Sequence, residues 1–193
     1  MPIIYFITHP EVLINPEQDI QAWSLSEKGQ QRTHNSLAQP WWHDIAALYS
    51  STERKAIETT EIIAHQLSLK YTQIATLGEM DRSSTGYLPR AEFELTADHF
   101  FSQPTVSVRG WEKAVDAQTR IVTAIDDISK QHTHQKVTII SHGGVGALLL
   151  AHLHHASISR QFDQPGNGGG NYFVFDTHTQ QVLTTWKPFD VVE

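Results

Sequence analysis

The chain has 193 residues, with 14 lysines and arginines against 21 aspartates and glutamates, 12 histidines and no cysteine. The lack of cysteine excludes disulfides, thiolate metal sites and cysteine nucleophiles, and the formal net charge of −7 argues against a nucleic-acid or membrane partner. A hydrophobic fraction of 39% with 18% charged residues is typical of a globular chain, and the length favours one domain over residues 1–193.

Short apolar runs alternate with segments of helical periodicity in the first part of the chain. The expected strands are residues 3–7, 45–49 and 71–76, and the expected helices are residues 27–38 and 52–67. Ser26 is suited to cap the first of these helices, because its hydroxyl can accept a hydrogen bond from a free backbone N–H. Residues 78–110 show no sustained periodicity, so we expect an irregular insertion or lid over one edge of the sheet.

Regular patterns return after this segment. One apolar helical face runs from Ala114 to Ile128, and the remaining expected elements are a strand at 136–141, a buried helix at 145–153 and a hairpin of residues 172–176 and 182–186. Strands that alternate with helices predict an α/β fold. We expect a three-layer α/β/α sandwich with a mostly parallel central sheet.

No segment is typical of a targeting signal or a membrane span. The apolar residues 1–7 lack a preceding basic region and are followed at once by His9 and Pro10. The apolar residues 145–151 are far too few to cross a bilayer. We therefore expect a cytoplasmic protein.

Three polar segments follow expected strands. Thr8 and His9 come after the first strand, residues 50–55 after the second, and residues 141–143 after the fourth. Because ligands of parallel sheets collect at the carboxyl ends of strands, near helix N-termini, these segments predict an anion-binding crevice. A neutral imidazole there is a competent nucleophile towards phosphorus, although each histidine could instead simply cap a strand end.

These segments resemble the motifs of the histidine phosphatase superfamily, which is also called phosphoglycerate-mutase-like. Residues 7–11 occupy the place of its Arg-His-Gly, and residues 139–145 match its second-histidine motif. Leu25–Gly29 is similar to its Leu-Ser/Thr-x-x-Gly helix start, Tyr49–Thr59 to its Ser-Ser-x-x-x-Arg-Ala segment, and Leu77–Glu79 to its Leu-x-Glu. The matches keep the family's order from residue 3 to about residue 176.

The resemblance implies hydrolysis of a phosphomonoester without a metal or other cofactor. His9 would become phosphorylated, Glu79 would act as general acid and then base, and His142 would donate to the phosphoryl oxygens. Asp81, in the same short loop as Glu79, is the alternative acid. The expected partner is a phosphorylated small molecule or a phosphoprotein.

Further residues are candidates for substrate binding. Thr8, Lys55 and Gly143 lie within the matched motifs, and Asn15 lies where some relatives place a phosphate-contacting asparagine. A turn residue before Pro16 is an equally good interpretation of Asn15. Substrate specificity would depend mainly on residues 11–23 and 78–110.

Two substitutions remove arginines from the family's pocket. Thr8 stands in place of the arginine before the nucleophile, and Lys55 in place of the second one. Lysine keeps the charge but loses the planar two-pronged donor, and threonine offers a single neutral hydroxyl. Pro10, in place of glycine, also removes a backbone N–H. Arg82 is the leading candidate to compensate, followed by the candidates Arg54 and Arg90.

These departures keep a second class of function open. The chain is then a weak or inactive relative that binds a phosphorylated ligand or a protein. His9, Glu79 and His142 together favour the enzyme, because a binding module has little need of an acid beside two histidines. A phosphosugar mutase is less favoured, because the chain is short for the segments that would enclose a mutase substrate.

Overall fold

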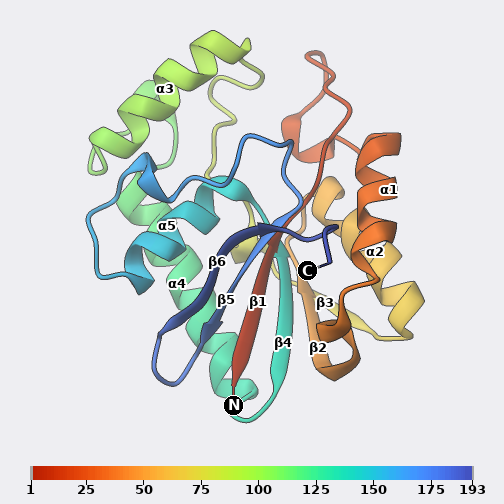
Figure 1. The fold of residues 1–193 in the computed structure, drawn as a ribbon. Coiled ribbons are helices and arrows are strands. Elements are labelled where there is room, and N and C mark those ends of the chain that lie inside the picture. The colour runs from red at the N-terminus through yellow and green to blue at the C-terminus, as the bar shows by residue number, and fades with distance from the viewer. Residues whose placement is uncertain (1, 193) are drawn as a thin grey trace.

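A mixed six-stranded sheet forms the centre of the computed structural model, which describes residues 2–192 (Figure 1). The strand order is β3-β2-β4-β1-β5-β6. The strands are β1 (Ile3–Thr8), β2 (Ile45–Ser50), β3 (Tyr71–Gln73), β4 (Lys136–Ser141), β5 (Asn171–Asp176) and β6 (Val182–Pro188). The first four pair in parallel, and the β5–β6 hairpin extends the sheet by antiparallel pairing with β1.

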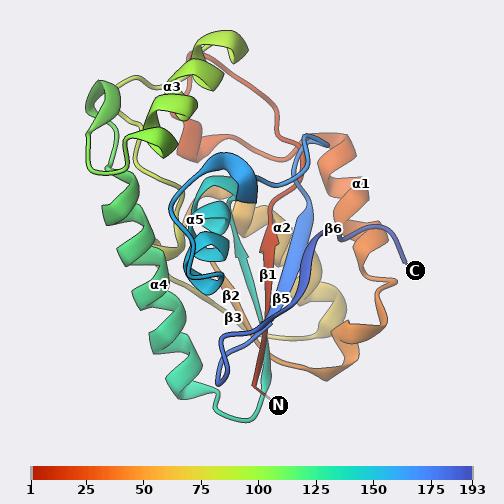
Figure 2. The same cartoon turned by 60° about the vertical axis from the view of Figure 1, so that its left-hand side comes forward.

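Helices cover both faces of this sheet, as predicted. One face carries α1 (Glu27–Ser36) and α2 (Arg54–Leu67), and the other carries α4 (Ala114–Gln131) and α5 (Gly143–Leu153) (Figures 1 and 2). The three-layer α/β/α sandwich and its mostly parallel sheet are therefore confirmed.

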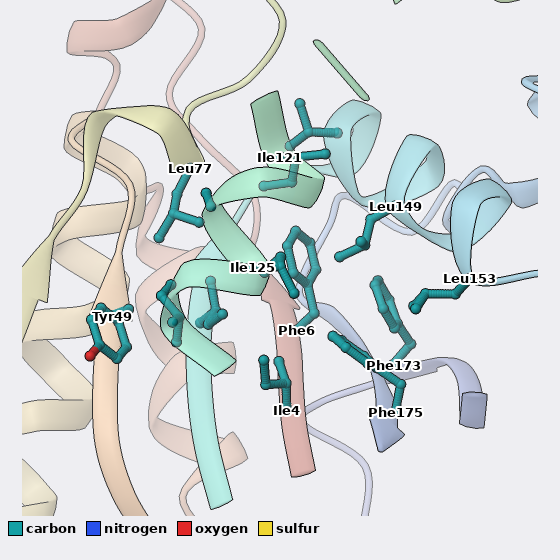
Figure 3. Packing of buried hydrophobic residues seen from close by; sticks show 14 of the residues in the cluster. Ile4, Phe6, Tyr49, Leu77, Ile121, Ile125, Leu149, Leu153, Phe173 and Phe175 are labelled. Atoms are coloured by element: carbon teal, nitrogen blue, oxygen red, sulfur yellow. The ribbon is translucent and has the colours of Figure 1, made fainter. Parts of the chain in front are cut away.

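The central strand β1 supplies both halves of the core, because successive side chains of a strand point to opposite faces. Phe6 and Ile4 pack with α4 and α5 through side chains such as Ile125 and Leu149 (Figure 3). Ile7 packs on the other face, in a cluster that includes residues of α2. Burial on both faces explains why this strand is a continuous apolar run in the sequence.

The expectation of an irregular segment at 78–110 is wrong in one respect, because α3 (Arg90–Ser102) lies within it. Only the carboxyl half of α3 is buried, through Ala97, Phe100 and Phe101, whereas Leu95 is 64% exposed. Phe93, Ala97, Phe100 and Phe101 do recur at helical spacing, but the exposed Leu95 weakens the amphipathic pattern. Figure 1 shows α3 beyond the carboxyl end of the sheet, where its aromatic side chains pack with Met80, close to the predicted acid.

Smaller differences concern element ends. The third strand stops at Gln73 and is followed by a 3-10 turn at Ala75–Leu77, whereas a strand to residue 76 was expected. Helix α5 begins at Gly143, two residues earlier than its apolar pattern indicates. Within residues 2–192, no helix combines the length and apolarity that a membrane crossing needs.

Candidate active site

Side chains that follow β1, β2 and β4 meet in a cavity of about 410 Å³. The register places Thr8 beside Ser141, so the next residues, His9 and His142, are neighbours, with ring centroids 5.1 Å apart. Five of the predicted site residues line the cavity, namely His9, Lys55, Glu79, Arg82 and His142. The structure thus brings together most of the groups that the strand-end argument and the resemblance selected.

The imidazole of His9 is neutral. Its Nδ1 lies 2.9 Å from the carbonyl oxygen of Pro10, and because a carbonyl oxygen only accepts, Nδ1 carries the proton and Nε2 keeps its lone pair. Burial, helped by the nearby charge of Lys55, lowers the pKa of His9 to about 4. Pro10 therefore removes a backbone donor but provides the acceptor that orients the ring.

A glycine-rich turn fixes the backbone of His9. The N–H of Gly170 donates to the carbonyl oxygen of His9 at 3.0 Å. A side chain on Gly169 would bring its Cβ within 2.3 Å of the same oxygen, and Gly169 has a φ of +74°, so glycine is needed at this position. The segment is thus a support for His9.

His142 is fully buried and is bonded through one ring nitrogen. Its Nε2 lies 2.7 Å from Ser51 Oγ and 3.3 Å from Glu53 Oε1. Within residues 2–192, Nδ1 has no hydrogen-bond partner. Burial holds the pKa of His142 well below its usual value, although the Glu53 carboxylate opposes this effect.

Glu53 is a further carboxylate in the site, and it contacts several predicted residues. Its Oε2 lies 2.5 Å from Lys55 Nζ, and its Oε1 accepts the backbone N–H of Glu79 at 2.8 Å. Burial raises the pKa of Glu53, but His142 and Lys55 outweigh burial and lower this pKa to about 2. Lys55 also donates to the carbonyl oxygen of Ile20 at 2.8 Å, so its charge is largely committed within the protein.

Glu79 lies against the N-terminus of α5. Its two carboxyl oxygens accept the backbone N–H groups of Gly144 and Val145, each at 2.9 Å. Burial nevertheless raises the pKa of Glu79, which favours the protonated form that a general acid needs. Arg120 fixes the preceding backbone, because it donates to the carbonyl oxygens of Gly78 and Glu79.

Asp81, the alternative acid, also lines the cavity but is exposed. Its Oδ1 accepts the backbone N–H of Ser83 at 2.9 Å, and this bonding lowers its pKa. A carboxyl group with a lowered pKa is ionised at neutral pH and has no proton to donate, so the surroundings favour Glu79 over Asp81 as the general acid.

Of the three candidate arginines, Arg82 is the one that lines the cavity. Its guanidinium lies over the ring of Phe93, 5.0 Å from the centroid, an arrangement that leaves the in-plane N–H groups available to a ligand. Arg54 is exposed and paired with Glu58 at 2.8 Å, and Arg90 is exposed at the start of α3.

Three of the predicted binding residues do not line the cavity. The Thr8 side chain is fully buried, and its hydroxyl donates to Gln164 Oε1 at 2.7 Å. Asn15 is exposed, and its Oδ1 accepts the N–H of Glu17 at 3.1 Å, as the turn interpretation expects. Gly143 lies beside Gln164 at the start of α5.

Sequence reasoning missed Glu53, Ser51 and Arg120 as parts of the site. A signal for Glu53 was present, because an acidic residue two positions before Lys55, at the start of a helix after a buried strand, is placed to pair with it. Arg120 gives no such signal, because it is one of several polar residues on the outer part of α4 and contacts the site only through the folded chain.

A family model for the histidine phosphatase superfamily (branch 1) matches residues 4–187. The chain aligns with the YhfR protein of Bacillus stearothermophilus at 26% identity and a TM-score of 0.79, over 94% of this chain and 95% of that one. A mycobacterial glucosyl-3-phosphoglycerate phosphatase, solved with inorganic phosphate, aligns at 17% identity and a TM-score of 0.77, over 98% and 99% of the two chains.

An α-ribazole phosphatase from Shigella flexneri aligns at 16% identity and a TM-score of 0.74, over 99% of this chain and 98% of that one. No curated protein matches the sequence. The last two structures show a shared fold, whereas the family model covers nearly the whole chain. The protein therefore belongs to the histidine phosphatase superfamily (branch 1).

Proposed function

We propose that this protein hydrolyses phosphomonoesters through a phosphohistidine on His9, without a metal. The observation that carries the proposal is the contact of His9 Nδ1 with the carbonyl oxygen of Pro10, which leaves the lone pair of Nε2 available. The ring of His142 lies beside that of His9, with 5.1 Å between the ring centroids. Membership of a phosphatase superfamily and the phosphatases among the similar structures support the same class of reaction.

The reaction would run in two steps. Nε2 of His9 attacks phosphorus as the ester P–O bond breaks, and the carboxyl group of Glu79 gives its proton to the leaving oxygen. Glu79, now ionised, then takes a proton from a water molecule that attacks the phosphohistidine. The P–N bond breaks, inorganic phosphate leaves, and His9 and Glu79 return to their starting states.

Carboxylates that line the cavity restrict the charge of the substrate that can bind there. The exposed Glu17, Asp19 and Asp81 line the cavity, together with the cations Arg82 and Lys55, and Lys55 is already paired with Glu53. We therefore propose a small phosphomonoester whose leaving group is uncharged, because a second anionic group would be repelled by these carboxylates.

A protein that only binds a phosphorylated ligand is the second candidate. The observation that favours it is the close pairing of Lys55 with Glu53, which removes one positive charge from a pocket that already has Thr8 in place of an arginine. The two candidates differ in turnover, so one experiment separates them.

The test is hydrolysis of an aryl phosphate by the wild-type protein in the presence of a chelator, followed by rapid quenching in alkali. We expect turnover that the chelator does not reduce, and an acid-labile phosphate attached to His9. Binding of vanadate without turnover would support the binding protein instead. Turnover that the chelator abolishes would contradict a metal-independent mechanism.

Arg82→Ala should weaken the binding of vanadate. A hydrogen bond to a charged group contributes about 1.5–3 kcal/mol, which corresponds to a loss of roughly ten- to a hundredfold in affinity. Arg82→Lys should give an intermediate loss, because it keeps the charge without the planar fork. Arg54→Ala is the matched control, since Arg54 is exposed and does not line the cavity. An unchanged inhibition constant in Arg82→Ala would exclude a role in anion binding.

A further inference from the structure

The Glu53 carboxylate contacts three separate parts of the site. Its Oε2 pairs with Lys55 Nζ at 2.5 Å, and its Oε1 lies 3.3 Å from His142 Nε2. The same Oε1 accepts the backbone N–H that precedes the Glu79 carboxyl group, at 2.8 Å. The residue is only 5% exposed, so these contacts are shielded from solvent. An exposed carboxylate would be hydrated and would not hold these three groups at fixed positions.

The bonding of His142 leaves one ring nitrogen for a ligand. Ser51 and Glu53 lie on the Nε2 side, whereas the buried Nδ1 has no partner within residues 2–192. A histidine that holds protons on both nitrogens would donate from Nε2 to Glu53 and from Nδ1 to an anion in the cavity.

The charges around His142 show why a carboxylate matters at this position. His9 from the end of β1, Lys55 in α2 and Arg120 in α4 all disfavour a proton on His142, and Glu53 is the opposing carboxylate that acts on it. Because Glu53 also pairs with Lys55, the charge of a bound phosphoryl group must be met by Arg82 and by a proton on His142.

We propose that Glu53 is a positioning residue that holds His142, Lys55 and Glu79 together and enables His142 to donate a hydrogen bond from Nδ1 to the phosphoryl group. A proton enters from solvent onto His142 as the anion binds, and it returns to solvent when phosphate leaves. The inference builds on the proposed function, but it concerns anion binding and is testable without turnover.

The test uses sulfate, which stays a dianion across the neutral range and so does not itself bind the proton. For the wild-type protein, we expect sulfate affinity to fall about tenfold per pH unit between the pKa of His142 in the free protein and its higher pKa in the complex, as one coupled proton requires. Nitrogen-detected NMR of the histidine rings should show that His142 takes up this proton in the complex.

In Glu53→Gln, the amide keeps an oxygen for the Glu79 N–H but loses the charge. We expect the His142 titration in the sulfate complex to move to lower pH, and sulfate affinity to become nearly independent of pH in the neutral range. Glu61→Gln, an exposed position on the same helix, is the control and should titrate like the wild type. A His142 titration that is the same in Glu53→Gln as in the wild type would overturn the proposal.

A second variant keeps the test decisive if Glu53→Gln does not fold, because that change leaves the buried Lys55 charge without its partner. The double variant Glu53→Gln with Lys55→Met removes both charges, and a smaller downward movement of the His142 titration is expected, because the loss of Lys55 favours a proton on His142 and partly offsets the loss of Glu53. If the wild-type protein binds sulfate with a protonated His142 but lacks turnover, the proposed phosphatase function fails and this inference stands. If turnover proceeds through His9 while His142 stays neutral in the complex, this inference fails and the proposed function stands.

Discussion

His9→Ala should reduce aryl phosphate turnover by roughly 10⁴-fold or more, because the variant has no atom to receive the phosphoryl group. Removing the nucleophile from a set of catalytic residues that act together commonly lowers the rate by at least this factor, since the remaining side chains cannot act without it. The measurement is kcat/KM of purified wild-type and variant proteins, together with alkaline quenching to detect the phosphohistidine.

The control for this experiment is His134→Ala, which removes an exposed histidine that precedes β4, at the opposite end of this strand from His142. It should retain wild-type activity and the phosphorylated intermediate. If His9→Ala kept substantial activity with a phosphate on another residue, the nucleophile would have to be reassigned, with His142 as the first alternative because its ring is adjacent.

The pH dependence of the reaction follows from the same residue. The pKa of His9 is lowered to about 4, so its nucleophilic form predominates above about pH 5 and is lost as the pH falls through 4. Glu79 acts in the opposite direction, because its raised pKa keeps the carboxyl proton to higher pH and the acid is lost as the pH rises. The profile of kcat/KM should therefore be bell-shaped, with its acid limb well below the usual range of a histidine.

Glu79→Gln should lower kcat for an alkyl phosphate by about 10²–10⁴-fold, which is the range that a positioned general acid contributes. The effect should be clearly smaller for an aryl phosphate with a good leaving group, because that leaving oxygen departs without a proton. The part of the alkaline limb that Glu79 contributes should disappear in the variant, whereas any part that comes from His142 should remain. The comparison of the two substrates thus reports on proton donation and not on folding.

Asp81→Asn tests the competing acid in parallel. Asp81 is exposed and its pKa is lowered by its bond with Ser83, so we expect its loss to leave the ratio of alkyl to aryl phosphate turnover unchanged. A selective loss of alkyl phosphate turnover in Asp81→Asn, with little change in Glu79→Gln, would transfer the role of acid to Asp81.

The sheet and the pair of histidines could be predicted because they depend on local patterns. The continuous apolar run of β1 reports burial on both faces, and parallel register brings residues that follow β1 and β4 together. Helix α3 could not be predicted in this way, because half of its length is exposed and its burial depends on aromatic contacts with the segment after Glu79.

The polar contacts of the site were less accessible from the sequence. The pairing of Glu53 with Lys55 depends on the directions of their side chains at the first turn of α2, which the sequence does not specify. The Glu53 carboxylate neutralises the charge of the lysine that the motif comparison selected. Strand geometry does explain Thr8, because its side chain points away from that of the next residue, His9. The structure shows this arrangement, with the Thr8 hydroxyl on Gln164 and Asn171.

The surroundings of Thr8 also bear on how this sequence can change over evolution. Thr8 Oγ1 donates to Gln164 Oε1 and accepts the N–H of Asn171, and Asn171 Nδ2 donates to the same Gln164 oxygen. An arginine at position 8 would need space beside Asn171, which is fully buried like Thr8, and would remove the two of these bonds that Thr8 makes. An arginine at this position therefore requires coordinated replacements at distant positions, and single mutations along that route pass through less stable intermediates. Position 8 is thus constrained by residues distant in the sequence, whereas exposed residues of the cavity, such as Glu17 and Asp19, are more easily substituted.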